Sequence, residues 1–175
     1  MPADTFLVLT IIGDDKPGLV ELLSSTVSRH QGNWLESSMS HLAGKFAGIL
    51  RVSVPIERAA ELQAALAGLA RLKVTAESSD ADEAPPRGRR LKLALVGHDR
   101  IGIVREVSQV LARHEVNVEE LITHTSSAPM SAEMLFHAQA KLLADPELNV
   151  RGLKTELEHL SSDLMVDITL DETIK

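Results

Sequence analysis

The amino-acid sequence predicts an α+β protein made of two tandem β-α-β-β-α-β units. The first observation is an internal repeat, because residues 12–20 recur as residues 96–104 with a constant offset of 84. Over residues 7–36 and 91–120 this offset gives 11 identities in 30 aligned positions. The second observation is hydrophobic periodicity, which alternates between a period of two and a period near 3.6 in the same order in both halves.

In the first half, an apolar β-branched run at 6–12 ends at a glycine and predicts a buried strand. Apolar residues then recur with helical spacing, and Pro17 suits the first turn of a helix because its missing N–H is not needed there. Gly32 is expected to mark the helix exit. The expected later elements are strands at 34–41 and 46–54, a helix around 62–69 and a strand at 72–78.

The second half repeats this order. We expect strands at 91–96, 116–126, 130–140 and 164–170, with helices around 103–111 and 150–160. A polar, Pro- and Gly-rich stretch separates the halves, so we expect one domain at 1–79, a linker at 80–89 and a second domain at 90–175. Each domain should be a ferredoxin-like unit, an antiparallel four-stranded sheet with two helices on one face.

Composition excludes several classes of function. The net charge of −7 and the total of four aromatic residues are unlike a direct nucleic-acid binder, which needs a basic surface or stacking platforms. No apolar run reaches the roughly 20 residues of a membrane span. The absence of cysteine and the start Met1-Pro2-Ala3-Asp4, which has no basic region, favour a cytoplasmic protein without a signal peptide.

The repeated turn between the first strand and the first helix carries the candidate binding chemistry. Gly18 and Gly102 precede helix starts, where N–H groups without helical partners and the positive end of the helix dipole favour an anion. Asp15 and Asp99 lie in the same turns and provide an acceptor for an ammonium group. An α-amino acid carries both charges on one carbon and therefore suits such a turn.

The segments 13–20 and 97–104 resemble the strand-to-helix turn of ACT domains, small modules that sense amino acids. Two tandem copies over nearly the whole chain are similar to the glycine cleavage system transcriptional repressor family. The resemblance implies a non-enzymatic regulator that needs no cofactor or metal and senses an amino acid of the glycine or serine class. Its output would be control of glycine and one-carbon metabolism through a separate DNA-binding transcription factor, with the sites at interfaces in a homo-oligomer.

The same resemblance implies ligand contacts from both copies of the turn and from the asparagine that begins the second strand, which is expected to lie beside the first strand. The second copy departs from the family pattern because Ile101 replaces proline, so the first, proline-stiffened turn is expected to bind better. The implied ligand-binding residues are Asp15, Pro17, Gly18, Asn33, Asp99, Gly102 and Asn117.

Other interpretations remain open at this point. The aspartates could simply cap their helices, and the glycines could serve only the turn conformation. The protein could be a ligand-free assembly module, or a small enzyme related to formyltetrahydrofolate deformylase that uses His98 and Asp99. His124 and His137 lie on strands expected to be neighbours and could approach a metal ion.

Overall fold

The computed structural model describes residues 4–79, 86–131 and 133–173. The chain divides into two compact units, Met1–Ala84 and Pro85–Lys175, which we call domain 1 and domain 2 and describe separately. Residues 80–85 of the predicted linker, and the first three residues of the chain, lie outside the described residues.

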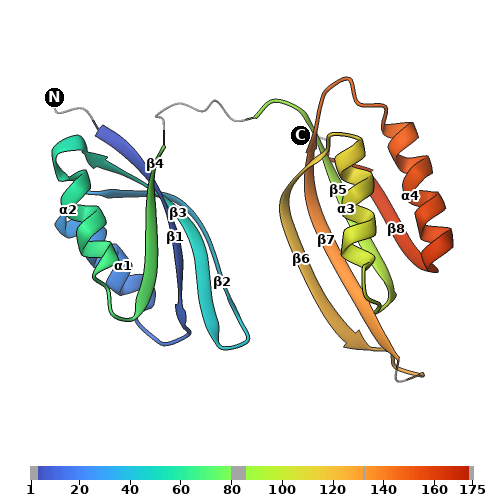
Figure 1. Ribbon diagram of the computed structural model, residues 1–175, viewed down its shortest axis with the longest axis horizontal. Helices are drawn as coiled ribbons and strands as arrows, with labels where there is room; N and C mark the ends of the chain where they lie inside the picture. Colours follow the sequence, from blue (N-terminus) through green and yellow to red (C-terminus); the bar gives the residue numbers. More distant parts are fainter. Residues whose placement is uncertain (1–3, 80–85, 132, 174–175) are drawn as a thin grey trace. The chain divides into compact units, whose positions relative to one another are not determined.

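Domain 1 has the predicted order of elements (Figure 1). The strands have longer bounds than the sequence pattern alone indicated, and the second helix begins directly after the proline that ends the third strand. The elements are β1 (Asp4–Asp14), α1 (Leu19–Arg29), β2 (Asn33–Leu42), β3 (Lys45–Pro55), α2 (Ile56–Ala67) and β4 (Leu72–Ser79).

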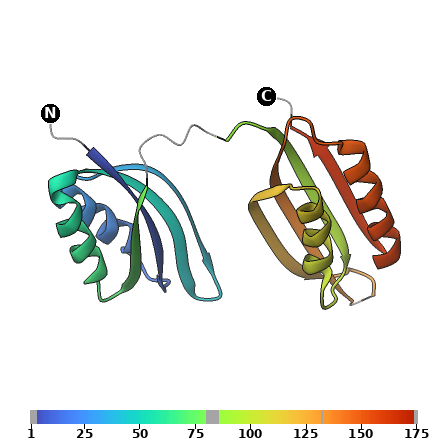
Figure 2. The same cartoon turned by 45° about the horizontal axis from the view of Figure 1, so that its top comes forward.

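Domain 2 repeats the arrangement, which confirms the predicted fold class of two tandem β-α-β-β-α-β units. The views in Figures 1 and 2 show both helices of each domain on one face of its sheet. The elements are β5 (Arg89–His98), α3 (Ile103–Arg113), β6 (Asn117–Ser127), β7 (Met134–Ala144), α4 (Val150–Leu164) and β8 (Val166–Glu172).

Each domain contains one antiparallel sheet, with strand order β2-β3-β1-β4 in domain 1 and β6-β7-β5-β8 in domain 2. The first helix of each domain therefore returns the chain to the opposite end of the sheet before the edge strand begins. As a result, β2 pairs with β3 and not with β1, and β6 pairs with β7 and not with β5.

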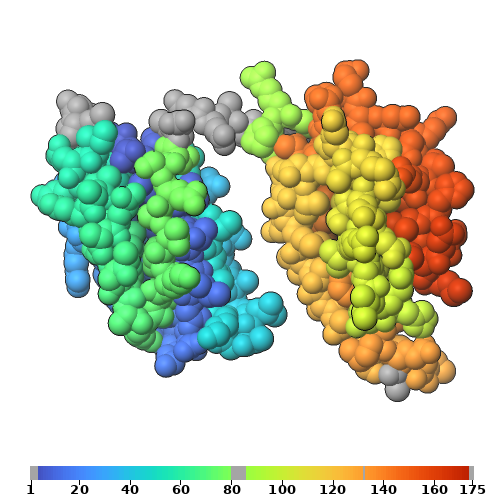
Figure 3. Space-filling view, in the orientation of Figure 1, coloured from blue at the N-terminus to red at the C-terminus, as the bar shows by residue number. Residues whose placement is uncertain are grey.

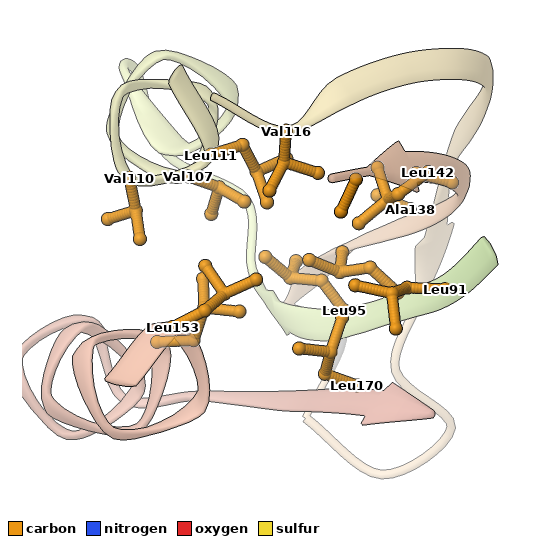
Figure 4. Close-up of a cluster of buried hydrophobic side chains, with 14 of the residues drawn as sticks. Leu91, Leu95, Val107, Val110, Leu111, Val116, Ala138, Leu142, Leu153 and Leu170 are labelled. Atoms are coloured by element: carbon orange, nitrogen blue, oxygen red, sulfur yellow. The ribbon is translucent and has the colours of Figure 1, made fainter. Parts of the chain in front are cut away.

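Each sheet buries one face against its helices, and each domain has a core of its own. In domain 1, Leu7, Leu9 and Ile11 alternate along β1 and pack under α1 and α2. In domain 2, residues from α3 and α4 point toward the sheet (Figure 4). That figure labels Leu91, Leu95, Val107, Val110, Leu111, Val116, Ala138, Leu142, Leu153 and Leu170, all of them buried.

Both first helices end in a Schellman motif with a left-handed residue that is not glycine. Gln31 has a φ of 59° and Glu115 has a φ of 54°. After α1, the N–H of Gly32 donates to the carbonyl of Val27 at 2.9 Å, and the N–H of Gln31 donates to that of Ser28 at 3.0 Å. Gly32 does follow the helix, as expected, but the left-handed position is taken by Gln31.

Among the described residues, no helix combines the length and apolar composition that crossing a membrane requires.

Candidate functional site

The repeated turn has the same backbone conformation in both domains. Gly18, with φ 89° and ψ 6°, directly precedes α1, and Gly102, with φ 94° and ψ −4°, directly precedes α3. Both lie in the left-handed region, which residues with a side chain adopt at a cost. A Cβ added to Gly18 would meet no atom within 4 Å, so glycine serves the conformation there rather than a close approach.

No side chain caps the N-terminus of α1 or of α3. The first intrahelical bonds run from the N–H of Leu22 to the carbonyl of Gly18, at 3.0 Å, and from Glu106 to Gly102, at 2.9 Å. The interpretation of Asp15 and Asp99 as helix caps is therefore wrong. The N–H groups of each first helical turn are left to face an anion, together with the positive end of the helix dipole.

The hairpin between β2 and β3 holds the first turn in place. The N–H of Asp15 donates to the carbonyl of Gly44 at 2.9 Å, and the Asp15 carboxylate lies 3.4 Å from Nδ1 of His41. The neighbouring Asp14 forms a short ion pair with Lys45, whose hydrogen bond and charge lower the pKa of that carboxyl. Asp14 is thus engaged, whereas the Asp15 side chain stays 40% exposed next to a histidine.

Asp15 and Gly18 line one shallow surface depression of about 370 Å³ at the start of α1. Pro17 lies between them, and its carbonyl accepts a hydrogen bond from Arg71 at 3.2 Å. The contact of His41 and the hairpin with this turn could not be predicted from the sequence, because it depends on how the hairpin folds over the turn. The depression is lined by Asp15, Lys16, Gly18, Leu19, Val20, Glu21 and Phe46.

The second turn has the same backbone but different charges. The N–H of Asp99 donates to the carbonyl of Met134 at 2.9 Å, which matches the bond made by Asp15 in domain 1. Arg100 donates to the Glu106 carboxylate at 2.7 Å, and that carboxylate lies 3.5 Å from the position of a Cβ on Gly102. In domain 1 the position of Glu106 is taken by Leu22, and the carboxylate of the first helical turn that lines the depression with Gly18 is that of Glu21.

The asparagines lie far from the turns of their own domains. Asn33 pairs with Ser53 on β3, whereas Asp14 pairs with Lys45, eight residues away along the same strand. At about 3.3 Å per residue this separation is about 26 Å. Asn117 and His98 are likewise eight residues apart along β7. The expectation that the second strand starts beside the first is therefore wrong, and no single domain brings its asparagine to its turn.

The histidines singled out in the sequence have local partners. His98 lies 3.5 Å from the Glu133 carboxylate. His124 and His137 face each other across β6 and β7 with parallel rings whose centroids are 4.6 Å apart, and Ser126 lies 2.8 Å from Nε2 of His137. Within the described ranges no group of three or more metal-binding side chains comes together.

Comparison with known proteins shows what the two domains resemble. A family model for the ACT domain matches residues 5–77, which lie in domain 1. A UPF0237 protein of Methanopyrus kandleri is 29% identical over 79 residues, and the match covers 45% of this chain and 82% of that protein.

Two crystal structures match both domains together. An unknown protein from Galdieria sulphuraria is 28% identical with a TM-score of 0.85, and the match covers 98% of this chain and 100% of that one. A proposed glycine cleavage system transcriptional repressor is 18% identical with a TM-score of 0.73, and the match covers 98% of this chain and 99% of that one.

The second of these matches shows a shared fold, and the ACT family model matches within domain 1. Both halves of the chain have the same order of elements, the same sheet topology and the same glycine turn. Residues 5–77 therefore match the ACT domain, and the two domains together share the fold of the proposed glycine cleavage repressor along nearly the whole chain.

Proposed function

We propose that this protein is a non-enzymatic regulator that binds a small amino acid of the glycine or serine class at ACT-domain interfaces. The observation that carries the proposal is the left-handed glycine turn before an uncapped helix, present in both domains with an aspartate in the same turn. The proposed output is control of glycine and one-carbon metabolism. It is supported by the fold shared with a proposed repressor of the glycine cleavage system.

The chemistry of the first turn suits a zwitterion. The ligand carboxylate would accept hydrogen bonds from the N–H groups of the first turn of α1, and its ammonium group would pair with Asp15. Lys45 already neutralises Asp14, so Asp15 is the carboxylate left to face a ligand. Pro17 restricts the backbone of the turn and so lowers the conformational entropy that is lost when the turn is ordered for ligand binding.

The position of the asparagines favours a site completed by another copy of the chain. Since Asn33 and Asn117 lie about 26 Å from the turns of their own domains, each would reach a ligand from a second copy. A homo-oligomer built by pairing ACT domains would supply that contact. We therefore propose that ligand binding and assembly are linked in this protein.

A partner protein would carry the output to DNA. The net charge of −7 disfavours direct binding to a phosphate backbone, since neutralisation of phosphates supplies most of the affinity of DNA-binding proteins. We propose a separate DNA-binding transcription factor as that partner, in the cytoplasm. Capture of this partner by the amino-acid-bound protein, and not by the free protein, is the expected result.

Titration calorimetry with glycine and L-serine tests the binding site. The Asp15→Asn variant should bind at the first turn at least tenfold more weakly, because it loses a charge-assisted contact of about 1.5–3 kcal/mol. Asp14→Asn is the matched control, since it removes the neighbouring carboxylate, which is engaged by Lys45, and should bind as the unmodified protein does.

A thermal melt gives a second reading. A ligand at 100 times its dissociation constant adds about 2.7 kcal/mol to the free energy of unfolding. A folded, oligomeric protein whose melting temperature and calorimetric heats do not respond to any amino acid at millimolar concentration would be an assembly module, and the proposal would be wrong. Equal losses of affinity in Asp14→Asn and Asp15→Asn would refute the role assigned to Asp15.

A further inference from the structure

Domain 2 contains an apolar cavity between α3 and the edge strand β6. Its volume is about 50 Å³. Figures 1 and 3 show α3 with β6 on one side and α4 on the other. Apart from the hydroxyl-bearing Ser108, the side chains around the cavity are hydrocarbon. The lining residues are Leu93, Leu95, Ile103, Val104, Val107, Ser108, Leu111, Val118, Leu121, Phe136, Ala138 and Ala140.

The repeat explains why this space is open in domain 2. Trp34 and Val118 are equivalent, since each follows the first asparagine of its edge strand and each precedes a break in the pairing register. On the helix-facing side the two domains carry residues of different size. Residues smaller in domain 2 are found at the equivalent pairs Trp34 and Val118, Met39 and Thr123, and Leu50 and Ala140, and residues larger in domain 2 at Ser37 and Leu121, Gly48 and Ala138, and Val52 and Leu142.

In domain 1 the larger side chains occupy the corresponding region. Leu50 is fully buried, and Trp34 and Met39 pack against the core around it. In domain 2 the equivalent Val118 is 39% exposed and forms part of the cavity wall, as does Ala140. The larger Leu121, Ala138 and Leu142 return part of the volume that is lost with the indole and the leucine side chain, and the space that stays unfilled is the cavity.

The cavity begins at the repeated turn. Ile103 and Val104, which line it, are the first two residues of α3 and directly follow Gly102. The cavity is accessible from solvent beside Val104 and Leu121, which are 43% and 50% exposed. Arg100 pairs with the Glu106 carboxylate beside Gly102, so a molecule with a carboxylate at the start of α3 can place a short hydrocarbon chain inside the cavity.

The size of the cavity selects the hydrocarbon. A water-sized group needs about 10–15 Å³ of such volume, so 50 Å³ holds about three to five carbon-sized groups. The side chains of valine and leucine have three and four carbons, whereas glycine has none. The walls offer a water molecule at most the Ser108 hydroxyl, so a hydrocarbon group that fills the cavity displaces only weakly held water.

We propose that domain 2 binds an aliphatic α-amino acid of valine or leucine size, with its side chain in this cavity and its carboxylate at the start of α3. The carboxylate contact rests on the proposed function of the turn, whereas the side-chain contact rests on the cavity alone. The two domains would then sense different amino acids, because Trp34 and Leu50 occupy the corresponding region in domain 1.

Calorimetry with L-leucine and glycine on the full chain tests this inference. Leucine should bind domain 2 at least tenfold more tightly than glycine does, since each buried methylene contributes a factor of roughly ten or more. Val118→Trp and Ala140→Leu restore the residues of domain 1 and should each weaken leucine binding at least tenfold. Ile122→Trp adds the same indole to the opposite face of β6 and should leave leucine binding unchanged.

Two further measurements locate the ligand. The methyl resonances of Ile103 and Val107 should shift when L-leucine is added, and this result does not depend on any variant folding. L-leucinamide, which lacks the carboxylate, should bind at least tenfold more weakly than leucine. Equal binding of leucine and its amide would refute the carboxylate contact.

The outcomes separate this inference from the function proposed above. If glycine or serine binds through Asp15 but leucine binds no more tightly than glycine, the inference fails and the proposed function stands. If leucine binding survives both Val118→Trp and Ala140→Leu, the cavity is not its site. If no amino acid binds at all, both proposals are wrong.

Discussion

Replacing Gly18 by alanine isolates the cost of the left-handed turn. The φ of Gly18 is 89°, and a Cβ added there meets no atom within 4 Å, so the variant introduces backbone strain without a clash. For a residue with a Cβ this region costs about 1–2 kcal/mol relative to the right-handed one. Domain 1 is therefore expected to lose about 1–2 kcal/mol of unfolding free energy.

The assay follows domain 1 alone. The protein has a single tryptophan, Trp34, which packs against the core of domain 1. Its fluorescence therefore reports the unfolding of this domain, while circular dichroism follows both. In a domain of about 80 residues, 1 kcal/mol shifts the melting temperature by roughly 4–8 °C, so the fluorescence transition should move by at least that amount.

Gly102→Ala provides the matched control. Gly102 has nearly the same φ, 94°, but lies in domain 2, so its variant should move the circular-dichroism transition and not the Trp34 transition. A Gly18→Ala variant with an unchanged Trp34 transition would refute the argument from backbone strain. A loss well above 2 kcal/mol would show that the turn is constrained by more than its own φ.

Two further changes test other parts of domain 2. Gly97→Ala should destabilise domain 2 by about 1–3 kcal/mol, because the added Cβ would lie 2.6 Å from the Cβ of Val166; a circular-dichroism melt unchanged by the variant would contradict this. Hydrogen bonds from Arg113 and then His114 lower the pKa of Glu156. A lowered folded-state pKa stabilises the fold above the ordinary glutamate value of about 4.3, and this gain is lost as the pH falls through the folded value. Glu156→Gln should therefore be less stable than the unmodified protein at pH 7 and should approach it at pH 3, and a difference in urea midpoint that stays constant with pH would contradict the assignment.

The fold was predictable because its signals are local and occur twice. The apolar stripe of α1 and the alternation along β3 each lie within about ten residues, and the offset of 84 transfers both to domain 2. Gly18 and Gly102 share one conformation for the same reason, since a left-handed residue before a helix has few alternatives.

The placement of Asn33 was not predictable at this level. The order of elements is compatible with the edge strand lying beside β1, and only the pairing of β2 with β3 shows that it does not. The separation of Asn33 from Asp15 then follows from the path of the chain, because α1 and the turn after it carry the chain back toward the opposite end of the sheet. Periodicity predicts which residues form a strand, but the neighbours of that strand are set by the packing of the whole domain.

The cavity in domain 2 shows the same limit. Alignment of the two copies of the repeat shows that Val118 stands in domain 2 where Trp34 stands in domain 1. That Ala140 lies on the same wall, and thereby enlarges the same space, requires the register of β6 against β7. Residues that differ between the two copies indicate a function only when the structure shows that they lie next to one another.

The left-handed residues after α1 and α3 give the protein a reserve of stability. Gln31 and Glu115 each occupy a position that glycine fills with less strain, and each lies at the end of its helix away from the glycine turn. Replacing either residue by glycine removes about 1–2 kcal/mol of backbone strain from the folded state. Glycine loses more conformational entropy on folding, which costs about 0.5–1 kcal/mol, so the free energy of unfolding should rise by roughly 0.5–1 kcal/mol at each position. Because the two positions lie in different domains with separate cores, the gains should be additive. The double variant with glycine at both positions would have more stability to lose when the binding turns are changed. Loss of binding could then be measured separately from loss of folding.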